Sequence, residues 1–376
     1  MSIAQQVIDL CGLWRFQPDA AEEGERLGYP TAESEPRMWR EAMLPATFER
    51  CLPGLASYEG AVWFRRECAV PDHWRGKRVR LQFEGVNYHA KVWVNGQWVG
   101  RNEDGFLPFE FAVHHALRCG GRNSVTVCVD NIRRQGEVPG MERGWRPFGG
   151  VLREVRLAAG DLLRIESAHI VAEPAGRGGG FRLRAGVVNE RGESAQAELR
   201  VAVLGSDGSE LRAEAAEPRR LASGGTAEVE VQAAVPNVTP WSPERPALYT
   251  AAVELRAAGE VVDRREIRFG FRRVEARDGK LLLNGEPMIL RGFNRHEDSP
   301  AKDMATDLDA ARDDLIQMKR MGVNFVRLCH YPHHPGELDL CDEIGLLVMG
   351  EIPLYWWNGL AEGEENCRRK LEAAKR

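Results

Sequence analysis

Three short segments combine side chains that bind hydroxyl groups or transfer protons, and each follows an apolar run. They are RGFNRHED (residues 291–298), RLCHYPHHP (residues 327–335) and GEIP (residues 350–353). Imidazole, guanidinium and carboxylate groups offer hydrogen bonds, and imidazole and carboxylate also act as general acids or bases. In a βα barrel, the reactive groups lie where the parallel strands end. The spacing therefore predicts that the three segments share one mouth.

The chain around these segments alternates between strand and helix patterns. Asn284-Gly285 marks the turn of a hairpin at 280–292 that leads into an apolar strand ending in GFNRHE. The other predicted elements are a helix at 309–321, a buried strand at 324–331, a helix at 336–344, a buried strand at 346–353 and a helix at 362–376. This alternation is typical of parallel βα units, either doubly wound or closed into a barrel.

The first 158 residues instead predict an all-β sandwich. Val79, Leu81 and Phe83 alternate with polar neighbours, and Asn95-Gly96 is a strong hairpin signal between two apolar runs. Seven of the ten tryptophans lie in this part. Their rings either stack on a sugar or pack in the core, and both interpretations stay open.

Residues 159–272 continue the alternation with more Ala, Val, Glu, Arg and Gly. Strands at this spacing, joined by polar turns such as GSDG (residues 205–208), fit an immunoglobulin-like sandwich. This part contains no cluster of catalytic residue types. We interpret it as a spacer that positions its neighbours.

Composition narrows the classes of partner. The 376 residues suggest two or three domains, and 51 Lys and Arg against 56 Asp and Glu give a net charge of −5 with no strongly basic block. Nucleic acid is therefore not an expected partner. Because the sequence shows neither a signal-peptide pattern nor a stretch of 18 apolar residues, we expect no membrane contact and a cytoplasmic location.

The eight cysteines form no CxxC pair, so we expect them to be mostly reduced and buried.

The three mouth segments, in this order and spacing, resemble the start of the catalytic barrel of glycoside hydrolase family 2, which contains β-galactosidases, β-glucuronidases and β-mannosidases. Further similarity lies in LWRF (13–16), YEGAVWFRR (58–66), GVN (85–87) and VWVNG (92–96). The resemblance implies three domains. They are a jelly-roll sugar-binding domain at 1–158, an immunoglobulin-like β-sandwich at 159–272 and the first three βα units of an incomplete (β/α)8 TIM barrel at 273–376.

The resemblance also implies an activity. Enzymes of this family are retaining exo-β-glycosidases, in which an acid/base and a nucleophilic carboxylate stand about 5 to 5.5 Å apart. In the family these two residues come from the fourth and seventh barrel strands. We therefore expect both to lie beyond the C-terminus of this sequence and the chain alone to be inactive towards a galactoside or glucuronide. The family pattern implies no cofactor here.

The site residues follow from the same resemblance. His296 and His330 match histidines that bind sugar hydroxyls, and the shell around them comprises Asn294, Arg295, Arg327 and Glu351. Arg327 and Glu351 also fit a purely structural ion pair. The loop ERGWRPFGGV (142–151) resembles one that leans toward the mouth, so Glu142 is a further substrate-binding candidate, and its Trp145 fits either that loop or the core.

Other arrangements of the same residues are possible. Glu297 and Glu351 both follow strands and could form a local catalytic pair, although neither matches the family's catalytic positions. Residues that suit zinc are Cys329, His330, His333, His334 and Cys341. Pro332 and Pro335 interrupt that spacing, and we expect no metal site. Residues 355–358 (YWWN) lack the Glu and His that hold magnesium in some relatives.

Three functions remain open. The chain is the N-terminal portion of an exo-β-glycosidase that binds a β-glycoside, or a non-catalytic carbohydrate-binding module, or one subunit of a split glycosidase. Three strands cannot close a barrel of eight, so an edge near 346–349 would expose unpaired backbone, which favours the first hypothesis. The family also implies a homo-oligomer or a partner that supplies the missing portion of the barrel.

Overall fold

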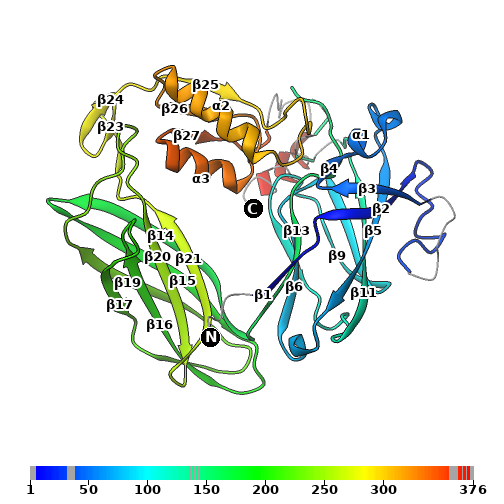
Figure 1. Ribbon diagram of the computed structural model, residues 1–376, viewed down its shortest axis with the longest axis horizontal. Helices are drawn as coiled ribbons and strands as arrows, with labels where there is room; N and C mark the ends of the chain where they lie inside the picture. The colour runs from blue at the N-terminus through cyan, green and yellow to red at the C-terminus, as the bar shows by residue number, and fades with distance from the viewer. Residues whose placement is uncertain are drawn as a thin grey trace.

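The structure is a computed structural model. It describes residues 6–31, 39–134, 137–138, 140–141, 144–354, 363–365, 367–369 and 371–372. The described chain forms a first sandwich (6–160), a second sandwich (163–269) and a barrel part (274–354), and the barrel part lies above and between the two sandwiches (Figure 1). No helix among the described residues is long and apolar enough to cross a bilayer.

The first sandwich is a jelly roll built from strands of period two. Its six-stranded sheet runs β3 (Arg40–Leu44), β2 (Gly12–Asp19), β5 (Ala61–Val70), β11 (Gly121–Asp130), β8 (His89–Val94) and β9 (Gln97–Asn102). The facing sheet runs β1 (Gln6–Asp9), β13 (Val155–Gly160), β6 (Arg78–Phe83) and β10 (Phe109–Ala112). The short strands are β4 (Ala46–Thr47), β12 (Gly150–Val151) and β7 (Val86–Asn87), and the short helices are α1 (Phe48–Cys51), η1 (Pro53–Leu55) and η2 (Asp72–Trp74).

Sequence patterns in this sandwich have direct structural counterparts. Asn95 and Gly96 have φ angles of 52° and 79° between β8 and β9, which the type I′ turn requires. Trp14 and Trp74 are buried in the main core, and Trp63 is buried in a second cluster with Trp93. Most of the described tryptophans in this part therefore pack inside, which favours the core interpretation.

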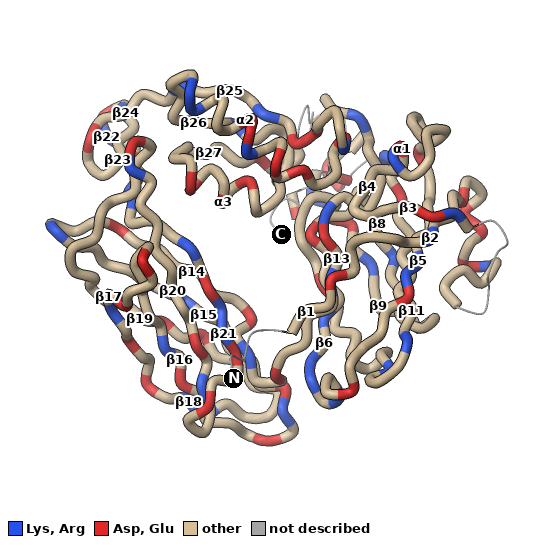
Figure 2. The backbone as a smooth tube through the Cα atoms, in the orientation of Figure 1, with Lys and Arg blue, Asp and Glu red and all other residues tan. Residues whose placement is uncertain are grey.

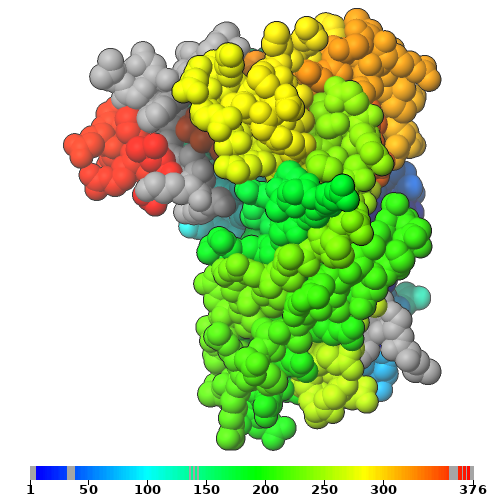
Figure 3. Space-filling model, turned by 90° about the vertical axis from the view of Figure 1, so that its left-hand side faces the viewer, coloured from blue at the N-terminus to red at the C-terminus, as the bar shows by residue number. Residues whose placement is uncertain are grey.

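The second sandwich has an immunoglobulin-like pair of sheets. One sheet runs β14 (Leu163–Ala175), β15 (Gly178–Asn189) and β19 (Thr226–Val235). The other runs β17 (Glu210–Ala215), β16 (Ala195–Leu204), β20 (Tyr249–Ala257) and β21 (Glu260–Phe269), with β18 (Arg219–Leu221) paired to β16. Inward residues such as Leu183, Val201 and Val253 form one core. Figure 3 shows this sandwich (green) beneath the start of the barrel part (yellow).

The barrel part begins with an antiparallel sheet and continues as parallel βα units. The antiparallel strands are β22 (Val274–Arg277), β23 (Lys280–Leu283) and β24 (Glu286–Met288), with Asn284-Gly285 at the second turn. The parallel strands are β25 (Gly292–Arg295), β26 (Phe325–Leu328) and β27 (Leu347–Gly350), and the helices are α2 (Leu308–Arg320) and α3 (Pro335–Ile344). Of the helix predicted at 362–376, the described residues are helical.

Two predicted strands are shorter in the structure. The strand expected at 324–331 ends at Leu328, and the strand expected at 346–353 ends at Gly350. Pro332 follows the first missing end, and Pro353 is the last residue of the second. Proline has no backbone N–H to donate to a neighbouring strand. The polar residues at the ends of both predicted strands thus lie in loops that follow the strands. Figure 2 shows Lys and Arg interspersed with Asp and Glu over all three parts.

Candidate functional site

The register of the parallel sheet decides which side chains share a face. Asn294 pairs with Arg327, and Arg295 pairs with Leu328. Since successive side chains on a strand point to opposite faces, Asn294 and Arg327 share one face while Arg295 and Leu328 share the other. Leu328 packs in a core with apolar residues of α2 and α3. Its face is therefore the helix side of the sheet, and the opposite face is the mouth.

His330 is held on the mouth side by an ion pair. Arg327 Nε donates to Glu351 Oε1 at 2.6 Å, and Glu351 Oε2 lies 3.1 Å from His330 Nδ1. Arg327 also lies 3.1 Å from His330 Nδ1 and 3.4 Å from Asn294 Oδ1. Burial opposes ionisation of Glu351, but its hydrogen bonds to Arg327 and His330 outweigh burial and lower its pKa. This mouth triad (Arg327, Glu351 and His330) is both an ion pair and a support that orients the imidazole.

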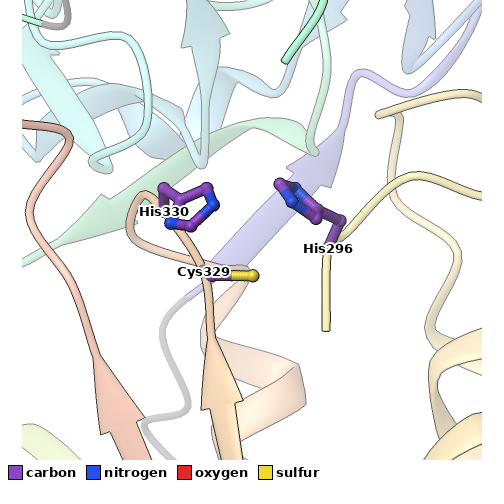
Figure 4. Close-up of side chains that lie close together, drawn as sticks. All are labelled: His296, Cys329 and His330. Carbon is purple, nitrogen blue, oxygen red and sulfur yellow. The ribbon is translucent and has the colours of Figure 1, made fainter. Parts of the chain in front are cut away.

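His296 faces His330 across the mouth (Figure 4). Their ring centroids are 5.1 Å apart with planes at 75°, and His296 Nδ1 lies 3.4 Å from the Tyr331 hydroxyl. Burial lowers the pKa of His296, and the charge of Arg327 acts in the same direction. A neutral imidazole offers one donor and one acceptor, the combination that a sugar hydroxyl can use.

Arg295 lies on the helix side, away from the mouth. Its Nη1 is 2.8 Å from each carboxylate oxygen of Glu337, and Glu337 Oε2 lies 2.8 Å from His333 Nδ1. Burial would raise the pKa of Glu337, but His333 and Arg295 lower it. The placement of Arg295 in the shell around the sugar histidines is thus corrected, because its side chain is only 4% exposed. This buried triad (Arg295, Glu337 and His333) instead supports the loop after β26, where His333 Nε2 lies 3.0 Å from the Cys329 carbonyl oxygen.

Glu297 joins the barrel part to the first sandwich. Arg153 Nη2 donates to Glu297 Oε2 at 2.9 Å and to the Pro332 carbonyl oxygen at 2.8 Å. The backbone N–H of His334 donates to Glu297 Oε1 at 3.0 Å. The Arg153 and Glu297 side chains are each 3% exposed. One guanidinium of the first sandwich thus holds both loops that carry the facing histidines.

These contacts do not support Glu297 and Glu351 as a local catalytic pair. A retaining glycosidase needs one protonated carboxylic acid and one carboxylate that can reach the sugar. Glu297 is buried against Arg153, and the pKa of Glu351 is lowered in its ion pair. Glu297 is therefore too buried to reach a sugar, and the lowered pKa keeps Glu351 ionised, so neither supplies the protonated acid.

The loop before β12 brings an aromatic ring to the mouth. The Trp145 and His330 rings are stacked with centroids 6.1 Å apart, and Trp145 Nε1 donates to the Tyr88 hydroxyl at 3.1 Å. Tyr331 lies within the apolar cluster that joins this loop to the barrel part. The first sandwich therefore contributes a wall to the mouth. Glu142 lies outside the described residues.

The candidate zinc ligands from the sequence do not form one site. His333 belongs to the buried triad, and His334 Nε2 lies 2.8 Å from Glu154 Oε2. Cys341 lies on the buried side of α3 and packs in the core. Cys329 and His330 instead lie close to His296, a residue that the sequence did not group with them. Residues 355–358, considered for magnesium, lie outside the described residues.

Sequence reasoning missed Arg153 and Tyr331. Arg153 is 144 residues from Glu297, and its basic side chain in a strand-rich segment gives no local signal of a buried pairing. Tyr331 follows His330 in the same loop, and burial raises its pKa well above the usual value. The only signal for Tyr331 was its place inside a polar segment at a strand end.

The described chain therefore has two β-sandwiches followed by parallel βα units, with two histidines facing each other where the strands end. Three family models match in sequence: the family 2 sugar-binding domain at residues 33–159, the family 2 model at 163–272 and the family 2 TIM barrel domain at 274–369. The chain belongs to glycoside hydrolase family 2.

Relatives support this membership. A β-galactosidase of Thermoanaerobacter pseudethanolicus is 33% identical over 83% of the chain and 41% of its own length. A β-glucuronidase of Paenibacillus borealis is 30% identical over 94% of the chain and 60% of its own length. The solved structure of Bacteroides uniformis β-glucuronidase 2 matches 99% of the chain and 45% of its own length, with 27% identity and a TM-score of 0.86. The chain thus spans about half the length of these relatives.

Proposed function

We propose that this chain is the sugar-positioning portion of a retaining exo-β-glycosidase that acts on terminal β-galactosides or β-glucuronides. The observation that supports this most directly is the pair of facing imidazoles, His296 and His330. The mouth triad fixes His330, and the Trp145 ring stands beside it. Two neighbouring imidazoles can bind two hydroxyls of one sugar ring, and an aromatic wall can cover its apolar face.

We also propose that the 376-residue chain does not hydrolyse glycosides by itself. Glu297 and Glu351, two of the carboxylates near the mouth, are each paired with an arginine. Within the described residues, β27 pairs with β26 on one side only, which favours a barrel completed by further strands over a stand-alone binding module. Those strands would supply the acid/base and the nucleophile.

Binding is tested on the full chain with methyl β-D-glucuronide and methyl β-D-galactoside by titration calorimetry. We expect weak binding of at least one glycoside, lost in His296→Gln and in His330→Gln. His169→Gln is the matched control, because His169 is exposed on β14 of the second sandwich. Binding that survives both mouth substitutions, or no binding of either glycoside to folded protein, contradicts the proposal.

Hydrolysis is tested separately with nitrophenyl β-glycosides. We expect no turnover by the chain alone. Turnover that Glu297→Gln or Glu351→Gln abolishes would show that these residues form the catalytic pair after all.

A further inference from the structure

Three metal-binding side chains meet at the mouth, contributed by two neighbouring strand ends. One donor atom from each of His296, Cys329 and His330 lies within 4.8 Å of the other two. Figure 4 shows the two imidazole rings facing each other with the Cys329 sulfur beneath them. Cys329 is buried, and both histidines are partly exposed. Within the described residues this is the only gathering of three such side chains with donor atoms this close.

The donor types select the kind of cation. Imidazole nitrogen and thiolate sulfur favour zinc and similar borderline or soft cations, whereas magnesium and calcium prefer oxygen. Three protein ligands with a fourth open position are the usual arrangement of an accessible zinc site. We propose that His296, Cys329 and His330 bind one Zn²⁺ ion at the mouth, with water as the fourth ligand.

The surroundings of the ligands fit this role. A zinc-bound histidine commonly donates its second ring N–H to a carboxylate, which fixes the ring and strengthens the metal bond. His330 Nδ1 lies 3.1 Å from both Glu351 Oε2 and Arg327 Nη2. When the ring donates its Nδ1 proton to Glu351, Nε2 is left to coordinate the metal. The Cys329 thiol lies 3.2 Å from the Arg295 carbonyl oxygen, which in the metal-free chain places the sulfur next to both imidazoles.

Binding requires defined local changes. Zinc bonds of about 2.0 to 2.3 Å place ligand atoms roughly 3 to 4 Å apart, so the three side chains must close in by about an ångström. The Cys329 S–H bond breaks, its proton passes to solvent, and a sulfur–zinc bond replaces the contact with the Arg295 carbonyl. No electron transfer is involved.

This site goes beyond the proposed function, and the evidence for it does not depend on that function. Under the proposed function the same imidazoles bind sugar hydroxyls, so Zn²⁺ and a β-glycoside would compete for one place. The metal test below needs no sugar. Its failure would therefore leave the glycosidase proposal standing, and the reverse also holds.

Cobalt(II) serves as a spectroscopic probe, titrated into the reduced, metal-free full chain. We expect a thiolate-to-cobalt charge-transfer band that saturates at one equivalent and disappears when Zn²⁺ is added. Cys329→Ala should abolish the band, whereas Cys341→Ala, which removes a buried cysteine of the same part, should keep it. Glu351→Gln should weaken zinc binding about tenfold, through loss of the support to His330.

A second ligand variant guards against misfolding of Cys329→Ala. His296→Gln should retain the fold by circular dichroism and lose tight cobalt binding. The proposal is overturned if the parent chain shows no charge-transfer band, or if the band persists in both Cys329→Ala and His296→Gln.

Discussion

The two faces of the parallel sheet each carry one arginine, one glutamate and one histidine, in different surroundings. In the buried triad the Arg295, Glu337 and His333 side chains are 4%, 3% and 0% exposed. In the mouth triad the Arg327, Glu351 and His330 side chains are 29%, 18% and 13% exposed. The same three residue types therefore serve two purposes, and accessibility separates them.

The difference in exposure indicates that the two triads of the barrel part have different roles. The buried triad is enclosed by α2 and α3, where an unpaired charge would be costly, so its members are bound to one another and to the backbone. The mouth triad keeps one side open to solvent, so its imidazole remains within reach of a ligand. Stability is expected to depend on the first triad and ligand binding on the second.

The largest expected effect is on the buried triad. Glu337→Ala leaves the Arg295 guanidinium buried without its main partner, and we expect a loss of about 4 kcal/mol in the free energy of unfolding. Urea denaturation of the full chain measures this loss. Glu343→Ala on the same helix is the control, with an expected loss below about 1 kcal/mol, because its ion pairs with Arg268 and Arg312 are partly exposed. Equal losses in both variants would contradict the comparison.

The next effect concerns the link to the first sandwich. Arg153→Met leaves Glu297 buried and without its guanidinium partner, so we expect a loss of about 3 kcal/mol and a partial recovery in Arg153→Lys. Arg156→Met is the control, because Arg156 is 41% exposed and pairs with Glu84 at the surface. Thermal unfolding curves measure both. If Arg153→Met matched Arg156→Met, the buried link would contribute nothing to stability.

For the mouth triad we expect a small loss of stability and a larger loss of sugar affinity. Glu351→Gln should cost about 1 kcal/mol or less in stability, because the pair is partly solvated. Sugar affinity should fall about tenfold, since the charged partner that orients His330 is lost. Calorimetric titration and urea denaturation of one protein batch give both values. A large stability loss without a change in affinity would make the mouth triad a purely structural feature.

The smallest effect is the acid dependence of stability. The folded pKa of Glu351 lies below its usual 4.5, because hydrogen bonds from Arg327 and His330 outweigh burial. Its stabilising contribution is therefore complete above pH 4.5 and is lost as the pH falls through the folded pKa. Between these values, unfolding free energy should fall less steeply in Glu351→Gln than in the parent. Identical acid profiles would show that Glu351 has no stabilising charge interaction.

The sequence predicted much of this arrangement. Period-two apolar runs and Asn-Gly turns predicted both sandwiches, and alternating strand and helix patterns predicted the parallel units. Side-chain direction was harder to predict. Asn294 and Arg295 are adjacent and both polar, and only the register with Arg327 and Leu328 shows which one faces the mouth.

Long-range pairing was beyond the local patterns. Arg153 lies in the first sandwich, and its contact with Glu297 depends on how two separately folded parts pack. No periodicity in either segment encodes that packing. Motifs at strand ends found the facing histidines because strand direction alone brings such ends together.

The most direct test of the mouth is a crystal structure of this chain with methyl β-D-glucuronide or methyl β-D-galactoside bound. We predict that the sugar lies between His296 and His330, with its hydroxyls at hydrogen-bond distance from both rings. A sugar bound instead on the outer face of the first sandwich, with the mouth empty, would contradict the account.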